Sequence, residues 1–516
     1  MAEANLMTSS SSGGGGSVTV SGGGIPPSNC KNLRISKSGT SVSLKWKDSG
    51  DTLLEDKKLV CSWGGTMIRK KLGSYPTNET DGVLVVDNKV LNQYDETAYV
   101  DTISSSEEDW KYAAFPYSKN GMYCYHDKNQ FNEAIVYEFY LNPDESNPDL
   151  MITYPTGSRN ANFEPAAMNF SSGAFNYGDW EDAFFVKNTR PVMVNYDGTV
   201  AYELYKPNFN YRADGVTASD VSNANFGGNA MIAFPQVWFK IEMVGTLIHV
   251  CVANKQVDEN YHCYTHYNRL GELLDEIFIM AFQPANISSK LRSLAGKTIL
   301  TNNAGTTEIT LAQANGDSWS LIDYGEVQML YLLALLMCKS TNCQAKFGAG
   351  RQSGANATTG ECISKGMFYG TADNGPLKFF GIENYWGNYW KRCFGCMYTT
   401  TEGLKVKLCD YTKDGSTVIG YNTTGEGYNV IKPFSGSSGG YTSEIVMSSK
   451  GLFPTVASGS ATTKYCDGLW WANNGFAIVG GGSSSGALDG PFCLALHFAV
   501  SAANTTVGGS LSCKPS

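Results

Sequence analysis

One short motif in the sequence has the spacing of a nucleophilic serine. Gly482-Ser483-Ser484-Ser485-Gly486 matches the pattern Gly-x-Ser-x-Gly, which in hydrolases holds the serine on a sharp turn between a strand and a helix. An acid and then a histidine must follow, and Asp489 and His497 do. The match lies inside a tract of glycine and serine rather than between a strand and a helix, so we expect no hydrolase chemistry here.

A second group of residues has the side chains of metal ligands. It consists of His249, Cys251, His262, Cys263 and His266. Two histidines four residues apart lie on the same side and within reach of one metal ion when the segment is a helix, whereas Tyr261-His262-Cys263-Tyr264 is typical of an aromatic strand or loop. We therefore expect no metal site in this segment.

Other patterns that carry catalysis are weak or missing from the sequence. Cys393-Phe394-Gly395-Cys396 has no second cysteine pair at zinc spacing and is interpreted as a core strand. Two catalytic carboxylates must face each other across a cleft. Pairs that are adjacent in the sequence, such as Glu107-Glu108 and Glu181-Asp182, give no indication of such a placement. No phosphate-binding or dinucleotide-binding loop is found. We expect a protein that is not an enzyme and has no cofactor.

Composition limits the partners that the chain can have. The 516 residues suggest about three domains. The net charge is −9, from 39 Lys+Arg against 48 Asp+Glu, and no basic run stands out, so we expect no binding to nucleic acid. The longest apolar run, Met329 to Cys338, is too short to cross a bilayer as a helix, and we expect no membrane insertion.

The start of the chain and the cysteines indicate the compartment. Residues 1–7 have neither a basic region nor an apolar region of the kind that directs export. The 14 cysteines are scattered, and scattered cysteines in a reducing compartment behave as small buried hydrophobic residues. We expect folding in the cytoplasm and no disulfide framework.

The chain divides into regions that differ in amino-acid composition and in predicted secondary structure. Residues 8–24 are almost wholly Ser and Gly and predict a flexible tether over 1–26. Short β-branched and aromatic strands follow, which predict a β-sandwich over 27–145. They are near 33–35, 42–46, 61–68, 83–86, 110–117 and 134–140. The placement of Trp46 and of the strand Tyr112–Tyr117 resembles fibronectin type III or immunoglobulin-like modules.

From residue 146 the pattern changes to mixed α+β. Strands such as Met231–Val244 and Ile277–Phe282 alternate with loops rich in Asn, Gly and aromatic residues. Two helices are predicted, one over Ile287–Ala295 with Ser288-Ser289 as a possible cap, and one over Leu321–Ser340. The second half of the latter is apolar at nearly all positions, which is typical of an enclosed helix.

The most distinctive motif of this region is Phe380-Gly381-Ile382-Glu383-Asn384-Tyr385-Trp386-Gly387-Asn388-Tyr389-Trp390. It resembles the signature of C-type-lectin-fold domains in phage tail and receptor-binding proteins, relatives of the formylglycine-generating-enzyme-like group and of retroelement-diversified variable proteins. Further segments resemble that family: 190–193, 197–200, 229–231, 235, 238–240, 291–294, 315–319 and 340–345. The resemblance covers roughly residues 150 to 516. It implies a β-rich first part over 146–300 and a C-type-lectin-like ligand-binding domain over 301–516.

Two departures from the enzyme branch of that family set the expected activity. That branch typically reads Gly-Asn-x-Trp-Glu-Trp, whereas here Trp390 is followed by Lys391-Arg392. Its catalytic cysteine pair cannot be placed on any two cysteines of this chain. The resemblance therefore implies a domain that binds a ligand and does not transform it.

In this family the last part of the fold displays the face that contacts the ligand. We expect that face to combine small polar residues with aromatic and apolar side chains. The predicted contact residues are Trp470, Trp471, Ser483, Ser485, Leu488, Phe492, His497, Ser501 and Asn504. Neighbouring positions on a strand point opposite ways, so at least one of Trp470 and Trp471 is expected to be buried. Which alternate set along the strand 493–500 points outward is left open.

The resemblance implies a bacteriophage tail-fibre or baseplate protein that attaches the virion to a receptor, a glycan or a protein, on the host bacterial surface. Its partners would be other tail or baseplate proteins and further copies of itself, as a homotrimer, assembled in the host cytoplasm. An architectural or decoration protein of the virion is the alternative. An enzyme of the formylglycine-generating type or a glycan-degrading enzyme is a third possibility. It is suggested by the relationship of the fold to such enzymes and by the cysteines and carboxylates that the chain contains.

Overall fold

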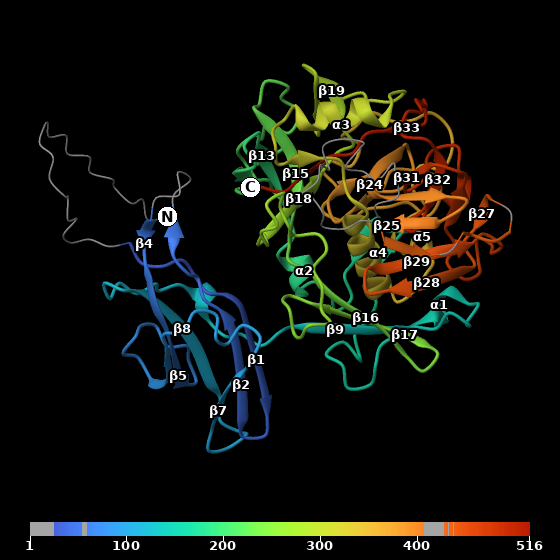
Figure 1. The fold of residues 1–516 in the computed structure, drawn as a ribbon. Coiled ribbons are helices and arrows are strands. Elements are labelled where there is room, and N and C mark those ends of the chain that lie inside the picture. Colours follow the sequence, from blue (N-terminus) through green and yellow to red (C-terminus); the bar gives the residue numbers. More distant parts are fainter. Residues whose placement is uncertain (1–24, 54–58, 407–427, 432, 437, 516) are drawn as a thin grey trace, which may run out of the picture. The chain divides into compact units, whose positions relative to one another are not determined.

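The chain is described by a computed structural model that covers residues 25–53, 59–406, 428–431, 433–436 and 438–515. It forms two compact units, Met1–Glu133 and Ala134–Ser516 (Figure 1). Nearly all of the tether expected over 1–26 lies outside the described residues. Strands make up 38% and helices 9% of the structure, so β-sheet dominates a mixed fold. Among the described helices, none is long and apolar enough to cross a membrane.

The first unit contains two three-stranded antiparallel sheets that share one core. One sheet has the order β1-β2-β7 and the other β6-β5-β8, and a short pair, β3 and β4, accompanies them. The core contains Trp46 from one sheet and Ile68 and Tyr112 from the other. The Trp46 indole is fully buried, and its N–H donates to Asp48 at 2.9 Å. The strands are β1 (Lys31–Ser38), β2 (Ser41–Lys47), β3 (Thr52–Leu53), β4 (Leu59–Cys61), β5 (Trp63–Leu72), β6 (Val83–Asn88), β7 (Tyr99–Thr102) and β8 (Trp110–Ser118), with a short 3₁₀ helix at Asp127–Asn129.

The strand predicted near 134–140 does not belong to this first unit. It forms β9 (Val136–Leu141), which pairs with β10 (Ile152–Thr153) on one side and β17 (Leu247–Ala253) on the other. β16 (Trp238–Val244) completes this four-stranded sheet. Because these pairings are long-range, the boundary between the units lies at 133/134, earlier than the boundary expected after residue 145.

Two larger sheets form most of the second unit. The six-stranded sheet has the order β14-β13-β15-β18-β34-β21, and the C-terminal sheet has the order β26-β25-β24-β31-β32-β30-β27, with β33 beside β24. The first set comprises β13 (Arg190–Asn195), β14 (Val200–Glu203), β15 (Gly228–Pro235), β18 (Glu276–Met280), β21 (Trp319–Ser320) and β34 (Ser512–Cys513). The second comprises β24 (Trp390–Thr399), β25 (Gly403–Val406), β26 (Tyr428–Ile431), β27 (Gly440–Tyr441), β30 (Gly468–Trp471), β31 (Gly475–Val479), β32 (Leu494–Phe498) and β33 (Val507–Gly508).

Short elements connect these sheets. The helices are α1 (Pro148–Met151), α2 (Phe184–Lys187), α3 (Gly305–Gln313), α4 (Tyr324–Cys338) and α5 (Cys343–Phe347). The two-stranded pairs are β11 (Ala167–Asn169) with β12 (Ala174–Asn176), β19 (Ala285–Ile287) with β20 (Lys290–Arg292), β22 (Lys378–Phe379) with β23 (Ile382–Glu383), and β28 (Glu444–Ser448) with β29 (Gly451–Val456).

Helix α4 confirms the helix predicted over 321–340, and all of its residues are buried. Its first turn is closed by a capping box, in which Asp323 accepts from the Glu326 N–H and Glu326 accepts from the Asp323 N–H. Its last turn ends at Lys339, which has the left-handed φ of 52°. One core surrounds α4 and contains side chains from both large sheets. Figure 1 shows α4 in the middle of this unit, beside β24.

The helix predicted over 287–295 is wrong. The segment is the hairpin of β19 and β20, and Ser288 and Ser289 form its two-residue turn with φ values of 54° and 58°. Two successive residues with positive φ give the twist that joins antiparallel strands. The serines interpreted as a helix cap are therefore turn residues.

The end of the chain returns to the middle of the second unit. β34 pairs with both β18 and β21, so residues 512–513 complete a sheet that begins at residue 190. Lys514, which follows β34, forms an ion pair with Asp323 and lies 3.4 Å from the Glu326 carboxylate. The regions expected at 146–300 and 301–516 thus share one sheet and one core.

Replacing Lys514 with Met tests whether the ion pairs of Lys514 with Asp323 and Glu326 stabilise the second unit. Lys514, Asp323 and Glu326 are all buried, so the substitution leaves two carboxyl groups without their cation. We expect the unfolding free energy to fall by about 3–5 kcal/mol, measured by urea denaturation of the full chain. The control is Lys187→Met, because Lys187 pairs with Asp182 in an exposed ion pair, which should cost less than about 1 kcal/mol. Equal stability of the two variants would contradict a stabilising role of the buried Lys514 ion pairs.

Candidate ligand-binding surface at the C-terminal sheet

The predicted contact residues lie on β30, on β32 and on the two loops that flank β32. β30 runs parallel to β32, with Trp470 opposite Ala495, and β31 pairs with β32 on its other side. The sheet therefore provides a fixed frame for the segments 480–493 and 499–506. The structure places the predicted residues in two separate groups along this frame and buries two of them.

The first group is centred on Trp470, which is half-buried. Its indole packs edge-on against Trp390, with ring centroids 5.6 Å apart and planes at 81°. The same indole lies over Gly468: a Cβ on Gly468 would come within 2.5 Å of the ring and 3.1 Å of the Leu488 Cβ. Gly468 is thus the position at which Trp470 and Leu488 converge.

The loop that carries Ser483 and Ser485 is anchored beside this group. The Ser483 N–H donates to the Asn388 carbonyl at 3.0 Å, and its hydroxyl bonds the side chain of Asn356. The Ser485 hydroxyl accepts from the Gly482 N–H at 3.2 Å. Asn388 belongs to the aromatic and Asn-rich motif of 380–390, so this motif holds the loop in place. Trp470, Leu488, Ser483 and Ser485 are called the Trp470 surface below.

Buried ionisable groups lie beneath this loop. Asp467 accepts from the Phe492 N–H at 2.8 Å and from the Gln344 side chain at 3.2 Å. Burial raises the pKa of Asp467 to about 8 and that of Asp489 to about 9. Burial also lowers the pKa of Lys391 to about 7, and its ammonium donates to the Tyr389 carbonyl at 2.8 Å. At neutral pH the loop therefore rests on carboxyl groups that retain their protons.

Trp471 and Phe492 belong to the core and do not reach the Trp470 surface. Trp471 packs edge-on against Phe434 at 5.3 Å, and Phe492 stacks on Tyr331 of α4 at 4.2 Å. Both are buried. Both rings pack inside the unit, so they are not placed to contact a ligand at the Trp470 surface as predicted.

The second group, formed by His497, Ser501 and Asn504, follows the end of β32. The His497 and Ser501 side chains are exposed. The Asn504 carbonyl accepts from the Asn302 N–H at 2.9 Å, which ties the loop to the segment that leads into α3. Asn504 is half-buried, and in the described part of the chain no residue of the Trp470 surface is among the contacts given for this group.

Neither alternate set of β32 faces solvent along its whole length. Leu494 and Leu496 point into the main core, and Ala495 packs in a smaller cluster with Trp390 and Ile478. The register shifts between Phe476 and Ile478 on the partner strand, and such a bulge interrupts strict alternation. The sheet is buried on both faces here, and only the end of β32 is exposed.

The serine motif does not assemble a catalytic triad. Asp489 is buried below the loop, and the His497 ring packs on Phe498 at 4.1 Å. The Ser485 hydroxyl is hydrogen-bonded to Asp489, but in the described part of the chain no hydrogen bond joins His497 to either of them. Every cysteine of the described part of the chain is free, and all but Cys124 are buried. Burial raises the pKa of thiols such as Cys362 and Cys493, which suppresses the reactive thiolate.

The histidines of the segment in which no metal site was expected, His262 and His266, have separate surroundings. His266 is fully buried, and its Nε2 lies 3.2 Å from the Phe234 carbonyl. Burial lowers its pKa to about 4, so it is a neutral core histidine. The His262 ring stacks on Tyr264 at 5.3 Å. His249 and Cys251 lie two positions apart on β17, and Cys251 packs in one small cluster with Tyr261 and Cys263.

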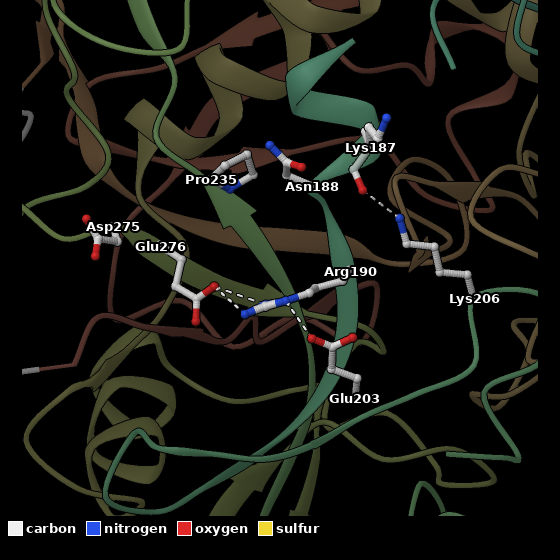
Figure 2. A pocket seen from close by; sticks show the side chains of 8 residues that line it. All are labelled: Lys187, Asn188, Arg190, Glu203, Lys206, Pro235, Asp275 and Glu276. Atoms are coloured by element: carbon white, nitrogen blue, oxygen red, sulfur yellow. Dashed lines mark hydrogen bonds and ion pairs between the residues drawn. The ribbon is translucent and has the colours of Figure 1, made fainter. Parts of the chain in front are cut away.

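A shallow pocket of about 380 Å³ lies on the six-stranded sheet (Figure 2). Arg190 lies at its centre and is held by two carboxylates, Glu203 at 2.9 Å and Glu276 at 2.7 Å. Lys206 points to the Lys187 carbonyl and donates to it at 2.9 Å. The guanidinium is engaged by carboxylates of this chain, so the pocket is an ion-pair network that links β13, β14 and β18. The sequence did not indicate it, because these residues are far apart along the chain.

Comparisons with known proteins give no family for this chain. No family model matches it, and no curated protein matches it.

Substitution of Asp489 tests the buried carboxyl beneath the loop. The folded chain keeps a proton on Asp489 that the unfolded chain releases above about pH 4. The stability from this group is therefore complete below that pH and is lost progressively as the pH rises to about 9. Asp489→Asn cannot ionise, so we expect its unfolding free energy to fall less steeply than that of the native chain between pH 5 and 7, by up to about 1.4 kcal/mol per pH unit.

The measurement is urea denaturation at several pH values. Asp182→Asn, at an exposed carboxylate, should leave the native slope unchanged. Identical slopes for the native chain and Asp489→Asn would refute the protonated state.

Proposed function

We propose that this protein is a non-enzymatic receptor-binding protein of a bacteriophage tail or baseplate, and that it binds a ligand on the host bacterial surface through the Trp470 surface. The resemblance of residues 380–390 to C-type-lectin-fold phage proteins supports the class of protein. The observation that carries the proposal is a half-buried indole fixed beside an anchored loop of small polar residues.

The chemistry of the Trp470 surface suits a sugar or a peptide. The indole of Trp470 supplies a rigid apolar area with one N–H donor, and Leu488 extends that area. Ser483 and Ser485 add hydroxyl groups on the loop that carries Leu488. A few polar groups around an aromatic anchor are typical of surfaces that recognise a ligand without reacting with it.

The anchoring of the loop favours binding. Backbone and side-chain hydrogen bonds hold Ser483 against Asn388 and Asn356, and β30 is fixed in the sheet by β32. Because the loop is already ordered before a ligand binds, little of the binding free energy is lost to the conformational entropy of ordering it. A surface this shallow binds weakly as a single site, so several copies on one particle, as in a trimer, would raise the avidity.

The environment of the thiols supports a binding role over the enzymatic alternative. An enzyme of the formylglycine-generating type needs an accessible, reactive cysteine for its oxidation reaction. The cysteines of the C-terminal sheet, Cys393, Cys396 and Cys493, are all buried, and burial raises their pKa values. These thiols are thus placed as core residues.

Replacing Trp470 with Ala tests the proposed function. We expect a fluorescently labelled full chain to bind host cells and to compete with adsorption of the phage. In the variant, the apparent affinity should fall by about 30-fold or more, which corresponds to the loss of a central aromatic contact worth about 2 kcal/mol. The matched control is Tyr211→Ala, at an exposed aromatic ring on another part of the same unit, which should bind as the native chain does.

Two results would contradict the proposal. A native chain that neither labels host cells nor competes with the phage is not the receptor-binding protein, and an architectural role would then be favoured. Equal binding by the Trp470 and Tyr211 variants would mean that a different surface contacts the receptor. Circular dichroism of both variants establishes that they are folded.

A further inference from the structure

Three metal-ligand side chains meet on the four-stranded sheet, away from the Trp470 surface. Glu138 on β9 lies opposite Cys251 on β17, and His249 precedes Cys251 by two positions on the same strand. Residues opposite each other, or two apart, project from the same face of a sheet. Their candidate ligand atoms all lie within 4.8 Å of one another. Strand pairing therefore brings the carboxylate of Glu138 to an imidazole and a thiol that are more than a hundred residues away in the sequence.

The distances are close to those of a tetrahedral zinc site. His249 Nε2 lies 2.9 Å from Glu138 Oε2 and 3.6 Å from Cys251 Sγ. Zinc bonds of ordinary length in a tetrahedron place neighbouring ligand atoms roughly 3.4–3.6 Å apart. The imidazole and thiol already have this separation, and a small rotation of the Glu138 side chain would provide the third ligand.

The groups around His249 are those that orient a metal-binding imidazole. Its other nitrogen, Nδ1, lies 3.5 Å from the Glu242 carboxylate, and Glu242 is held by Lys240 at 2.7 Å. The Tyr140 ring packs against the imidazole at 4.7 Å. A carboxylate behind a ligating histidine fixes its tautomer and raises its basicity, and this arrangement recurs at zinc sites.

Burial around Cys251 completes the site on one side. Cys251 is 4% exposed and packs with Trp238 and Tyr261 in a small cluster. Burial raises the pKa of the Cys251 thiol, and a hydrogen bond from the Tyr261 hydroxyl to its sulfur opposes part of this shift. His249 and Glu138 are half-buried, so the opposite side is open to water. Binding of the metal forms the metal–sulfur bond and releases the thiol proton to solvent.

We propose that Glu138, His249 and Cys251 bind one Zn²⁺ ion, with water as the fourth ligand, and that the ion clamps β9 to β17. The mixture of one sulfur, one nitrogen and one oxygen favours Zn²⁺ over Mg²⁺ or Ca²⁺, which take oxygen ligands. This site is independent of the proposed receptor-binding function. It stabilises the sheet at the start of the second unit.

Cobalt substitution tests the site in the full chain. The protein is stripped with a chelator and titrated with Co²⁺, whose bond to a thiolate gives a charge-transfer absorption. We expect one equivalent to bind with that band and with the visible bands of a tetrahedral ion, and Zn²⁺ to displace it. Cys251→Ser should abolish the charge-transfer band, and His249→Gln should weaken Zn²⁺ binding by about 100-fold or more. Glu242→Gln, behind the imidazole, should weaken it by about 10-fold.

The control is Cys124→Ser, which removes the one thiol outside the core of the described residues. This variant should bind Co²⁺ as the native chain does, and Zn²⁺ should raise the melting temperature of both. A native chain without the charge-transfer band overturns the proposal. A band that survives Cys251→Ser but disappears in Cys124→Ser also overturns it. If Cys251→Ser does not fold, the decision passes to His249→Gln, and unchanged Zn²⁺ affinity in that variant overturns the site.

Discussion

Helix α4 is buried along its entire length, and the architecture of the second unit follows from this constraint. A helix without a solvent face must be covered on every side, and side chains from both large sheets cover it. Its polar first turn is buried as well, so Asp323 and Glu326 need a cation inside the protein. Lys514 provides that cation. The end of the chain must therefore return to the helix, and β34 brings it there.

The proposed ligand-binding surface is a consequence of this packing. Phe492 stacks on Tyr331 of α4, and Leu494 and Leu496 of β32 point into the same core. The sheet is thereby fixed from below. Most of its outer face is filled by a small cluster around Trp390, so few side chains remain for a ligand. Trp470 is the largest of them, and the Asn-rich segment that ends at Trp390 anchors the loop next to it.

Local patterns in the sequence predicted the elements whose structure depends on near neighbours. The apolar run after Asp323 predicted α4, and alternation around Trp46 predicted strands of the first unit. Ser288 and Ser289 were misread as a helix cap, because serine suits both a cap and a turn and only the pairing of β19 with β20 decides between them. Alternation predicted that one of Trp470 and Trp471 is buried, and Trp471 is.

Long-range contacts could not be predicted in this way. The burial of Phe492 depends on Tyr331, which is more than a hundred residues away in the sequence. The assignment of β9 to the second unit depends on its pairing with β17, which also brings Glu138 to His249 and Cys251. A pattern of residue types along the chain carries no information on strand register between distant segments. The candidate residues at the C-terminal end were therefore predicted as one set, whereas the structure separates them into a half-buried group, a second group near the end of β32 and core residues.

The most direct test of the account is electron cryomicroscopy of the assembled phage particle with a soluble fragment of the host surface. The central claim is that the Trp470 surface faces outward and holds a foreign molecule. We expect Trp470 and Leu488 to be free of other virion chains and density for the fragment to lie against them. Burial of these two side chains against another virion protein would contradict it.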